Sequence, residues 1–348
     1  MKIISVFIMT ILCCVCISAK TVNLADYTTP NDGQNDSEGF QNAIDDLKES
    51  GGGTVMVTDG RWELRDGINI VYSIPVSVRI VGTKTAVMAP HIPADQALFN
   101  VGNLNQFELR DIVFVGDNTS SPDFGSLLVS SYVDQTKVSG CQFYGLRAAD
   151  SLIYIGNTDA VIEDNLFHGI ASGTANITAE NFRGLTVSHS QFIDYGNLMG
   201  AYYSKTPMGN GAWIKVDGGN AGTANALSQR AVVIRDVRLD EGARYGIDAR
   251  NLSYLNVRGV MNNVSGMEES AGLKMSNVEY ATIEQSKFGY PDVARPALLA
   301  LNNSKVMVSG LSVSQGVYFG ERDQNSEIHF DERFCTNCNT IQLRRSGK

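Results

Sequence analysis

Short segments of alternating apolar and polar residues recur along the chain at a nearly constant spacing. Segments such as FELRDIVF, TKVSGCQF and AVIEDNLF each place one apolar residue at the centre of a short strand pattern. Most intervals between centres are about 25 residues, and one, from Val187 to Ile234, is 47. This repeat predicts stacked coils of one solenoid, because a single coil is too small to bury its own apolar face. The predicted centres are Leu109, Val138, Ile162, Val187, Ile234, Val257, Ile283 and Val308.

A second marker recurs with the same period. An asparagine lies five or six residues before most of the centres. Asparagine tolerates left-handed backbone geometry, and its amide can bond to the backbone, so the pattern predicts one tight turn per coil. The residues concerned are Asn103, Asn157, Asn181, Asn251, Asn277 and Asn303.

The 47-residue interval predicts one coil with two insertions. The insertions are residues 196–211 and 218–229, and a strand pattern, AWIKVD, lies between them at 212–217. Long loops on a regular scaffold usually build the binding face.

An amphipathic helix is predicted ahead of the first coils. Apolar residues at helical spacing, Phe40, Ala43, Ile44 and Leu47, follow Ser37, which is the predicted cap. The run GGG at 51–53 ends the helix, and TVMV begins a strand. We expect this helix to cover the open apolar end of the solenoid.

This N-terminal stretch resembles the signature of the pectate-lyase-like right-handed parallel β-helix superfamily. The matching segments are Asn31-Asp32-Gly33, Ala43-Ile44-Asp45, Gly51-Gly52-Gly53-Thr54-Val55 and Gly60-Arg61-Trp62. Together with the coils, the resemblance covers most of residues 21–315. It implies an all-β, single-domain right-handed parallel β-helix with an N-terminal capping helix. It does not imply one reaction, because this scaffold hosts lyases, hydrolases, epimerases, tailspikes and adhesins.

The N-terminus of the chain predicts an exported protein, secreted or periplasmic. Residues 1–19 have one lysine, an apolar run and small residues before the predicted cut after Ala19, which is typical of a signal peptide. A lipid anchor on a cysteine at 13, 14 or 16 is the alternative. We assign 20–316 to the capped β-helix and 317–348 to a C-terminal cap and tail. Cys335 and Cys338 predict a local disulfide or two free thiols in preference to half of a zinc site.

Charge and hydropathy limit the kinds of partner that we expect the chain to bind. The formal net charge is −9, so a nucleic-acid partner is not expected. No stretch after the leader is long and apolar enough to span a membrane. The sequence does not indicate the oligomeric state.

The most informative strand is YGIDARN at 245–251. It matches AWIKVD at 212–217 and AGLKMSN at 271–277, and side chains alternate along a strand. With Ile214, Ile247 and Leu273 inward, one outward column holds Lys215, Asp248 and Lys274, and the next holds Asp217, Arg250 and Ser276. We expect Asp248 to hold the two lysines in place and the insertions to approach this cluster.

The cluster suits an acidic polysaccharide. Removal of the C5 proton of a uronate needs cations that neutralise its carboxylate, a base, and an acid for the leaving oxygen or the opposite ring face. We predict a uronate polysaccharide lyase or C5-epimerase, with an acidic polysaccharide as partner. The predicted catalytic residues are Lys215, Tyr245, Asp248 and Arg250, and the predicted substrate-binding residues are Tyr202, Tyr203, Lys205, Asp217, Lys274 and His189.

The same strand resembles the Tyr-Gly-Phe-Asp-Pro-His strand of mannuronan C-5 epimerases of this fold. Tyr245, Gly246 and Asp248 match it. Arg250 stands where the family has the histidine implied in proton transfer, which favours a lyase over an epimerase.

Two alternatives remain open. A polygalacturonase-type hydrolase would use two carboxylates such as Asp217 and Asp248, with Asn157-Thr158-Asp159 as a partial motif. A non-catalytic binder would use Tyr202, Tyr203, Trp213 and Tyr245 as sugar platforms. No metal site is predicted. Calcium, which several lyases of this fold use, would take oxygens from Asp217 and Asp248, but the lysines beside them argue against a cation there.

Overall fold

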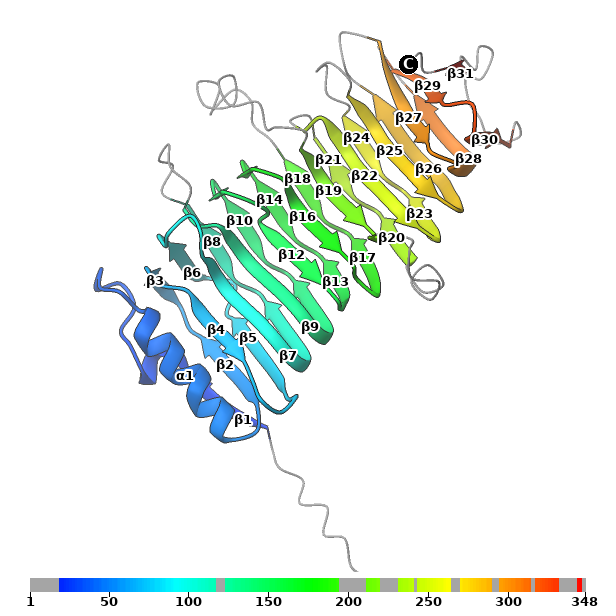
Figure 1. The fold of residues 1–348 in the computed structure, drawn as a ribbon. Helices are drawn as coiled ribbons and strands as arrows, with labels where there is room; N and C mark the ends of the chain where they lie inside the picture. The colour runs from blue at the N-terminus through cyan, green and yellow to red at the C-terminus, as the bar shows by residue number, and fades with distance from the viewer. Residues whose placement is uncertain are drawn as a thin grey trace, which may run out of the picture.

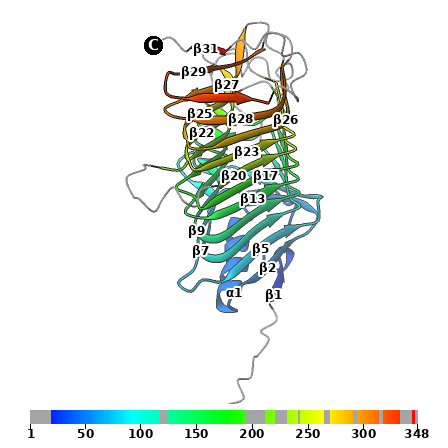
Figure 2. The same ribbon diagram turned by 90° about the vertical axis from the view of Figure 1, so that its right-hand side faces the viewer.

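The computed structural model describes residues 19–116, 123–193, 211–219, 231–240, 243–263, 270–289, 294–313, 317–331 and 343–345. These residues wind into an elongated parallel β-solenoid, with α1 (Ser37–Glu49) across one end and the C-terminus at the other (Figure 1). A view turned by 90° shows the coils stacked along one axis (Figure 2). The prediction of an all-β, single-domain right-handed parallel β-helix with a capping helix is confirmed.

Equivalent strands of successive coils form three parallel stacks. Stack 1 contains β4 (Ile68–Val71), the first halves of β7 (Ala97–Arg110) and β9 (Ser126–Ser139), β12 (Ile153–Gly156), β16 (Ala175–Glu180), β19 (Ala212–Asp217), β22 (Tyr245–Leu252), β25 (Ala271–Val278), β27 (Arg295–Leu301), β29 (Val317–Arg322) and β31 (Leu343–Arg345). Stack 2 contains β1 (Lys20–Asn23), β2 (Gly53–Val57), β5 (Ser77–Gly82), the second halves of β7 and β9, β13 (Asp159–Glu163), β17 (Gly184–Ser188), β20 (Ala231–Arg235), β23 (Tyr254–Arg258), β26 (Ala281–Gly289), β28 (Lys305–Val313) and β30 (Glu327–Phe330). Stack 3 contains β3 (Gly60–Leu64), β6 (Ala86–Pro90), β8 (Val113–Val115), β10 (Gln142–Tyr144), β14 (Leu166–His168), β18 (Gln191–Ile193), β21 (Arg238–Leu239), β24 (Met261–Asn263) and the ends of β26 and β28. A short pair, β11 (Arg147–Ala148) and β15 (Ala171–Ser172), and the 3₁₀ turn η1 (Leu24–Asp26) complete the described elements.

The predicted strand centres lie in register in stack 2. Leu109 pairs with Val138, Val138 with Ile162, and the column continues without a shift to Val308. All of these centres point into the solenoid and are buried. The period read from the sequence is therefore the period of the coils.

The core is an apolar column along the solenoid axis. Phe143, Phe167 and Phe192 from three successive coils stack nearly parallel, with ring centroids 4.8 Å and 4.4 Å apart. A coil has no closed core of its own, so such ladders bury one coil against the next.

The N-terminal helix covers the end of this core. Its predicted stripe, Phe40, Ala43, Ile44 and Leu47, is fully buried, and Gly51 to Gly53 follow with positive φ angles. The predicted cap needs correction, because Asp36 occupies the N-cap position and Ser37 is the first helical residue. The Ser37 hydroxyl accepts hydrogen bonds from the backbone N–H groups of Arg65 and Asp66, and so ties the helix to the first coil.

The predicted asparagine turns are confirmed. All six asparagines have positive φ, from 50° at Asn181 to 66° at Asn303. The side-chain amide of Asn277 donates to Asn251 on the preceding coil, at 2.9 Å. Parallel stacking also continues beyond residue 316, since β29 pairs with β27 and β30 with β28.

Candidate functional site

The two predicted outward columns exist in stack 1. Lys215, Asp248 and Lys274 are Cα partners on β19, β22 and β25, and Asp217, Arg250 and Ser276 are partners two residues further on. Stacked strands are about 4.8 Å apart, so these side chains share one surface of three coils. The register was predicted correctly, but the contacts within the columns differ from the prediction.

Asp248 is held by Arg250. The carboxylate accepts from Nε of Arg250 at 3.1 Å and from Nη2 at 2.6 Å, and this bond raises the pKa of the guanidinium. Only 2% of the Asp248 side chain is exposed, against 36% for Arg250. Among the described residues, Asp248 forms no ion pair with Lys215 or Lys274, which corrects the expectation that it holds both lysines.

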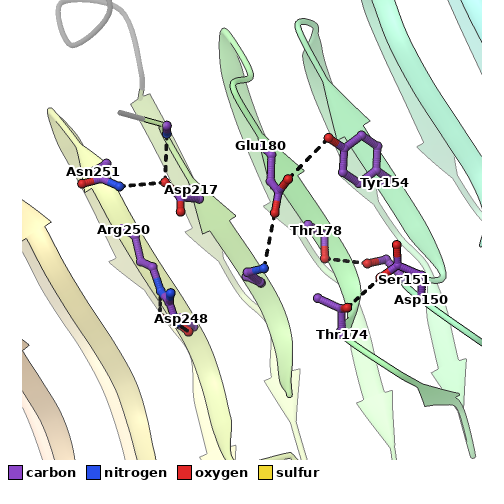
Figure 3. Close-up of polar contacts among 12 residues, drawn as sticks. Asp150, Ser151, Tyr154, Thr174, Thr178, Glu180, Asp217, Asp248, Arg250 and Asn251 are labelled. Carbon is purple, nitrogen blue, oxygen red and sulfur yellow. Dashed lines mark hydrogen bonds and ion pairs between the residues drawn. The ribbon is translucent and has the colours of Figure 1, made fainter. Parts of the chain in front are cut away.

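Lys215 instead pairs with Glu180 on the preceding coil. Its ammonium donates to Oε1 of Glu180 at 3.3 Å, and the Tyr154 hydroxyl lies 3.5 Å from Oε2. Burial and the neighbouring Glu180 raise the pKa of Tyr154. Figure 3 shows Tyr154 and Glu180 facing each other from adjacent strands.

Lys274 lies against Tyr245. The ammonium nitrogen is 4.6 Å from the ring centroid and 3.5 Å from the phenolic oxygen. Tyr245 is 5% exposed and packs against Ala212 and Ala271 of the neighbouring coils. No carboxylate among the described residues lies within ion-pair distance of Lys274, so this cation is paired with a phenol.

Asp217, the last residue of β19 and a member of the second column, binds the turn that follows it. Its Oδ1 accepts from the backbone N–H of Gly219 and from the amide of Asn251, both at 2.8 Å (Figure 3). These two bonds fix the carboxylate at the start of the second insertion.

Sequence reasoning missed the polar residues on the two preceding coils. Ser151 bonds to Thr178 at 2.7 Å, and Thr174 donates to Asp150 at 2.6 Å (Figure 3). Glu180 is the direct Cα partner of Asp217. The asparagine marker at 181 already placed Glu180 in this column, so extending the alignment by one coil would have found it.

His189 is not part of this cluster. It lies at the corner between stacks 2 and 3, with Asp164 at 3.9 Å and Asp236 at 3.6 Å. Tyr202, Tyr203 and Lys205 lie outside the described residues, as do Cys335 and Cys338.

Residues on which the non-catalytic binder and the polygalacturonase-type hydrolase depended have structural roles. Trp213 is buried inside the solenoid and donates to the carbonyl of Asp240 at 2.6 Å, so it is not a sugar platform. In the Asn-Thr-Asp triplet, Asn157 forms the left-handed turn, Thr158 is buried and donates to the carbonyl of Val133, and Asp159 pairs with Arg183 at 3.7 Å.

A hollow of about 570 Å³ lies away from these residues, at the corner of stacks 2 and 3. Its cations Lys84, Arg110 and Lys137 each have a carboxylate partner within 4.0 Å. Because each of these cations already has a carboxylate partner, we assign the candidate site to the polar residues that converge on stack 1 instead.

The outward columns of stack 1 carry more cations than carboxylates from β19 to β25. Among their described residues are three cations, Lys215, Arg250 and Lys274, and two carboxylates, Asp217 and Asp248. The formal net charge of the whole protein is −9, so this excess is a local feature.

The carboxylates here do not suit a calcium ion. Both oxygens of Asp248 bind Arg250, and Oδ1 of Asp217 already accepts two hydrogen bonds. Among the described residues, no group of three or more His, Cys, Asp or Glu side chains is arranged to hold a metal. The described part of the chain also has no helix with the length and apolar character needed to cross a membrane.

Comparison with known proteins gives similarity in structure only. No protein-family model and no curated protein matches the sequence. The structure of DFA-IIIase from Arthrobacter chlorophenolicus A6 in complex with GF2 matches at 12% identity and a TM-score of 0.58, over 94% of this chain and 98% of that one. The A-module of the mannuronan C-5 epimerase AlgE4 from Azotobacter vinelandii matches at 13% identity and a TM-score of 0.51, over 94% and 98%. Tailspike protein 2 from Escherichia coli O157:H7 bacteriophage CAB120 matches at 10% identity and a TM-score of 0.60, over 90% of this chain and 46% of that one.

At such identities the likeness establishes the fold. The chain shares the parallel β-helix along nearly its whole length with these proteins, which confirms the predicted resemblance at the level of fold. Fold likeness alone does not carry a reaction from one protein to another.

Proposed function

We propose that the protein is a secreted carbohydrate-active enzyme that removes the C5 proton of a uronate residue in an acidic polysaccharide, as a lyase or a C5-epimerase. The observation that carries this proposal is Lys274, a cation with no carboxylate within ion-pair distance among the described residues. Its ammonium lies 3.5 Å from the Tyr245 oxygen, on the same face of β19 to β25 as Lys215 and Arg250. A local positive field attracts a polyanion and stabilises negative charge that develops on it. Secretion rests on the predicted leader, residues 1–19, and is tested by the mass of the exported chain.

Lys274 and Tyr245 form the centre of the proposed reaction. The ammonium of Lys274 neutralises the uronate carboxylate, so that the charge that forms when the C5 proton leaves is stabilised. The Tyr245 oxygen, 3.5 Å from that ammonium, acts as a phenolate and takes the C5 proton to become a phenol. In elimination, the C4–O bond breaks, a C4–C5 double bond forms, and Lys215 gives a proton to the leaving oxygen. In epimerisation, the C4–O bond stays intact and Lys215 gives its proton to the opposite face of C5.

Asp248 and Arg250 have a positioning and binding role in this proposal. The buried carboxylate fixes the guanidinium through two hydrogen bonds, and the exposed third of Arg250 is accessible to a substrate. A preorganised arginine binds a substrate carboxylate without losing further side-chain freedom. The named mannuronan C-5 epimerase with the same fold supports the substrate class by analogy.

The proposal is tested on mature protein offered polyuronates and uronate-containing heteropolymers. A lyase produces an unsaturated uronate that absorbs in the ultraviolet, and an epimerase exchanges the C5 hydrogen with deuterated water. We expect Tyr245→Phe and Lys274→Met to lower kcat by about 10²-fold or more. Lys84→Met, in the hollow at another corner, is the control with the same charge change. The absence of both products on every uronate polymer would refute the proposal.

A glycoside hydrolase is the second candidate, because Glu180 and Asp217 are carboxylates on adjacent coils in direct register. Glycosidases use two carboxyl groups across the scissile bond. This candidate predicts new reducing ends without ultraviolet absorbance, and loss of that activity in both Glu180→Gln and Asp217→Asn.

A further inference from the structure

The outer face of stack 1 changes its charge along the solenoid axis. The outward residues of β12 and β16, together with Asp150 and Thr174 at equivalent positions before these strands, include two carboxylates and no cation. The carboxylates are Asp150 and Glu180. Their companions are hydroxyls, namely Tyr154, which bonds to Glu180, and Thr174, which bonds to Asp150 (Figure 3). The cationic part begins on the next strand, with Lys215. The face is therefore acidic on its N-terminal coils and basic on its C-terminal coils.

The boundary between the two parts is fixed by a contact. Lys215 lies 3.3 Å from Glu180, so the first cation of the basic part binds the last carboxylate of the acidic part. From β16 to β25 there are three strand steps, about 14 Å in all. A sugar chain that lies along the axis therefore contacts both parts at once.

We infer that the site accepts a uronate residue on β19 to β25 and an uncharged sugar on β12 to β16, so that its substrate is a heteropolysaccharide in which uronate and neutral sugars alternate. This inference rests on the proposed function. A second uronate on the acidic coils would meet Asp150 and Glu180, and like charges placed together across an interface suppress binding of the wrong partner. A neutral sugar has hydroxyl donors for the same carboxylates, and carboxylate acceptors form strong hydrogen bonds.

Asp150 is the residue that tests the inference with least disturbance. It is exposed, and its described side-chain partner is the Thr174 hydroxyl, which an asparagine oxygen can still accept from. Glu180→Gln removes the second charge but also loosens Lys215, so it serves as a second variant. Asp236→Asn, at the corner of stacks 2 and 3, changes the net charge by the same amount and is the matched control.

The experiment compares kcat/KM on alternating polymers, hyaluronan and unsulfated chondroitin, with kcat/KM on the homopolymers polygalacturonate and polymannuronate. We expect the wild type to favour an alternating polymer at least tenfold. Asp150→Asn should reduce that preference about threefold, Glu180→Gln should reduce it further, and Asp236→Asn should leave it unchanged. Circular dichroism and thermal melting establish that each variant is folded.

The outcomes separate the two proposals. A folded, active enzyme that prefers a homopolymer overturns the inference and leaves the proposed function standing. The same holds if Asp150→Asn and Glu180→Gln both keep the preference of the wild type. Inactivity of folded wild type on all four polymers overturns the proposed function, and this inference with it.

Discussion

The Asp248–Arg250 pair is asymmetric, and this gives a sharp test of the described geometry. The carboxylate is 2% exposed and the guanidinium 36% exposed. Removing Arg250 leaves a buried charge without its partner, whereas neutralising Asp248 leaves a cation that water can reach. We therefore expect Arg250→Gln to lower the free energy of unfolding more than Asp248→Asn.

The magnitudes follow from the burial of each partner. An unpaired buried charge costs about 3–5 kcal/mol, so we expect about 3 kcal/mol for Arg250→Gln, at the lower end because water can enter the vacated space. Charge-assisted hydrogen bonds contribute about 1.5–3 kcal/mol, which exposure of the guanidinium reduces to about 1.5 kcal/mol for Asp248→Asn. The double variant should cost less than the sum of both, because the penalty for the unpaired carboxylate disappears.

Guanidinium chloride unfolding of the wild type, the two single variants and the double variant measures these differences. The slope of the free energy of unfolding against denaturant concentration must be the same in all four. Asp240→Asn is the matched control, since Asp240 also pairs with an arginine two residues away, at 3.1 Å, and its partner Arg238 is 53% exposed. We expect the control to cost about 1 kcal/mol or less. If Asp248→Asn costs as much as Arg250→Gln, burial of the carboxylate does not govern the pair, and the reasoning is wrong.

Three further changes test the scaffold around the site. In Gly246→Ala the added methyl would lie 2.0 Å from Nδ2 of Asn262. Thermal unfolding should therefore show that the free energy of unfolding falls by about 2 kcal/mol or more, and kcat should fall too. In the control Gly102→Ala the nearest atom to the methyl is 3.4 Å away, so the free energy of unfolding should change by under about 0.5 kcal/mol. Phe167→Ala opens the aromatic ladder and should cost about 3–5 kcal/mol in denaturant unfolding; a cost under about 1 kcal/mol would contradict the ladder. Hydrogen bonds from a lysine ammonium and a tyrosine hydroxyl hold the pKa of Asp46 below its usual range, so its stabilisation is present above about pH 4 and is lost as the pH falls. Asp46→Asn should therefore flatten the acid side of a plot of stability against pH, and an unchanged acid limb would refute this.

Periodic features were predictable because each coil must bury its apolar face against the next coil in the same way. The column from Leu109 to Val308, the asparagine turns and the register of Lys215, Asp248 and Lys274 all follow from one period and from the alternation of side chains. The helix stripe was equally local, although its cap was misplaced by one residue because Asp36 and Ser37 are both good capping residues.

The partners of the site residues were not predictable in this way. Register fixes which Cα atoms are neighbours, but a long side chain at one position can reach several acceptors. Lys215 bonds Glu180 on the preceding coil instead of its neighbour Asp248, because Arg250 on the same strand as Asp248 already occupies that carboxylate through two bonds.

The sequence by itself determined the solenoid, its helical cap and the columns of its outer face, because burying each coil against the next imposes a period that every residue type must respect. Only the tertiary structure decided that Asp248 is buried, that His189 lies at another corner, and that Lys215 bonds to Glu180. Those outcomes depend on side chains from different coils competing for the same few contacts, and no single repeat contains that information.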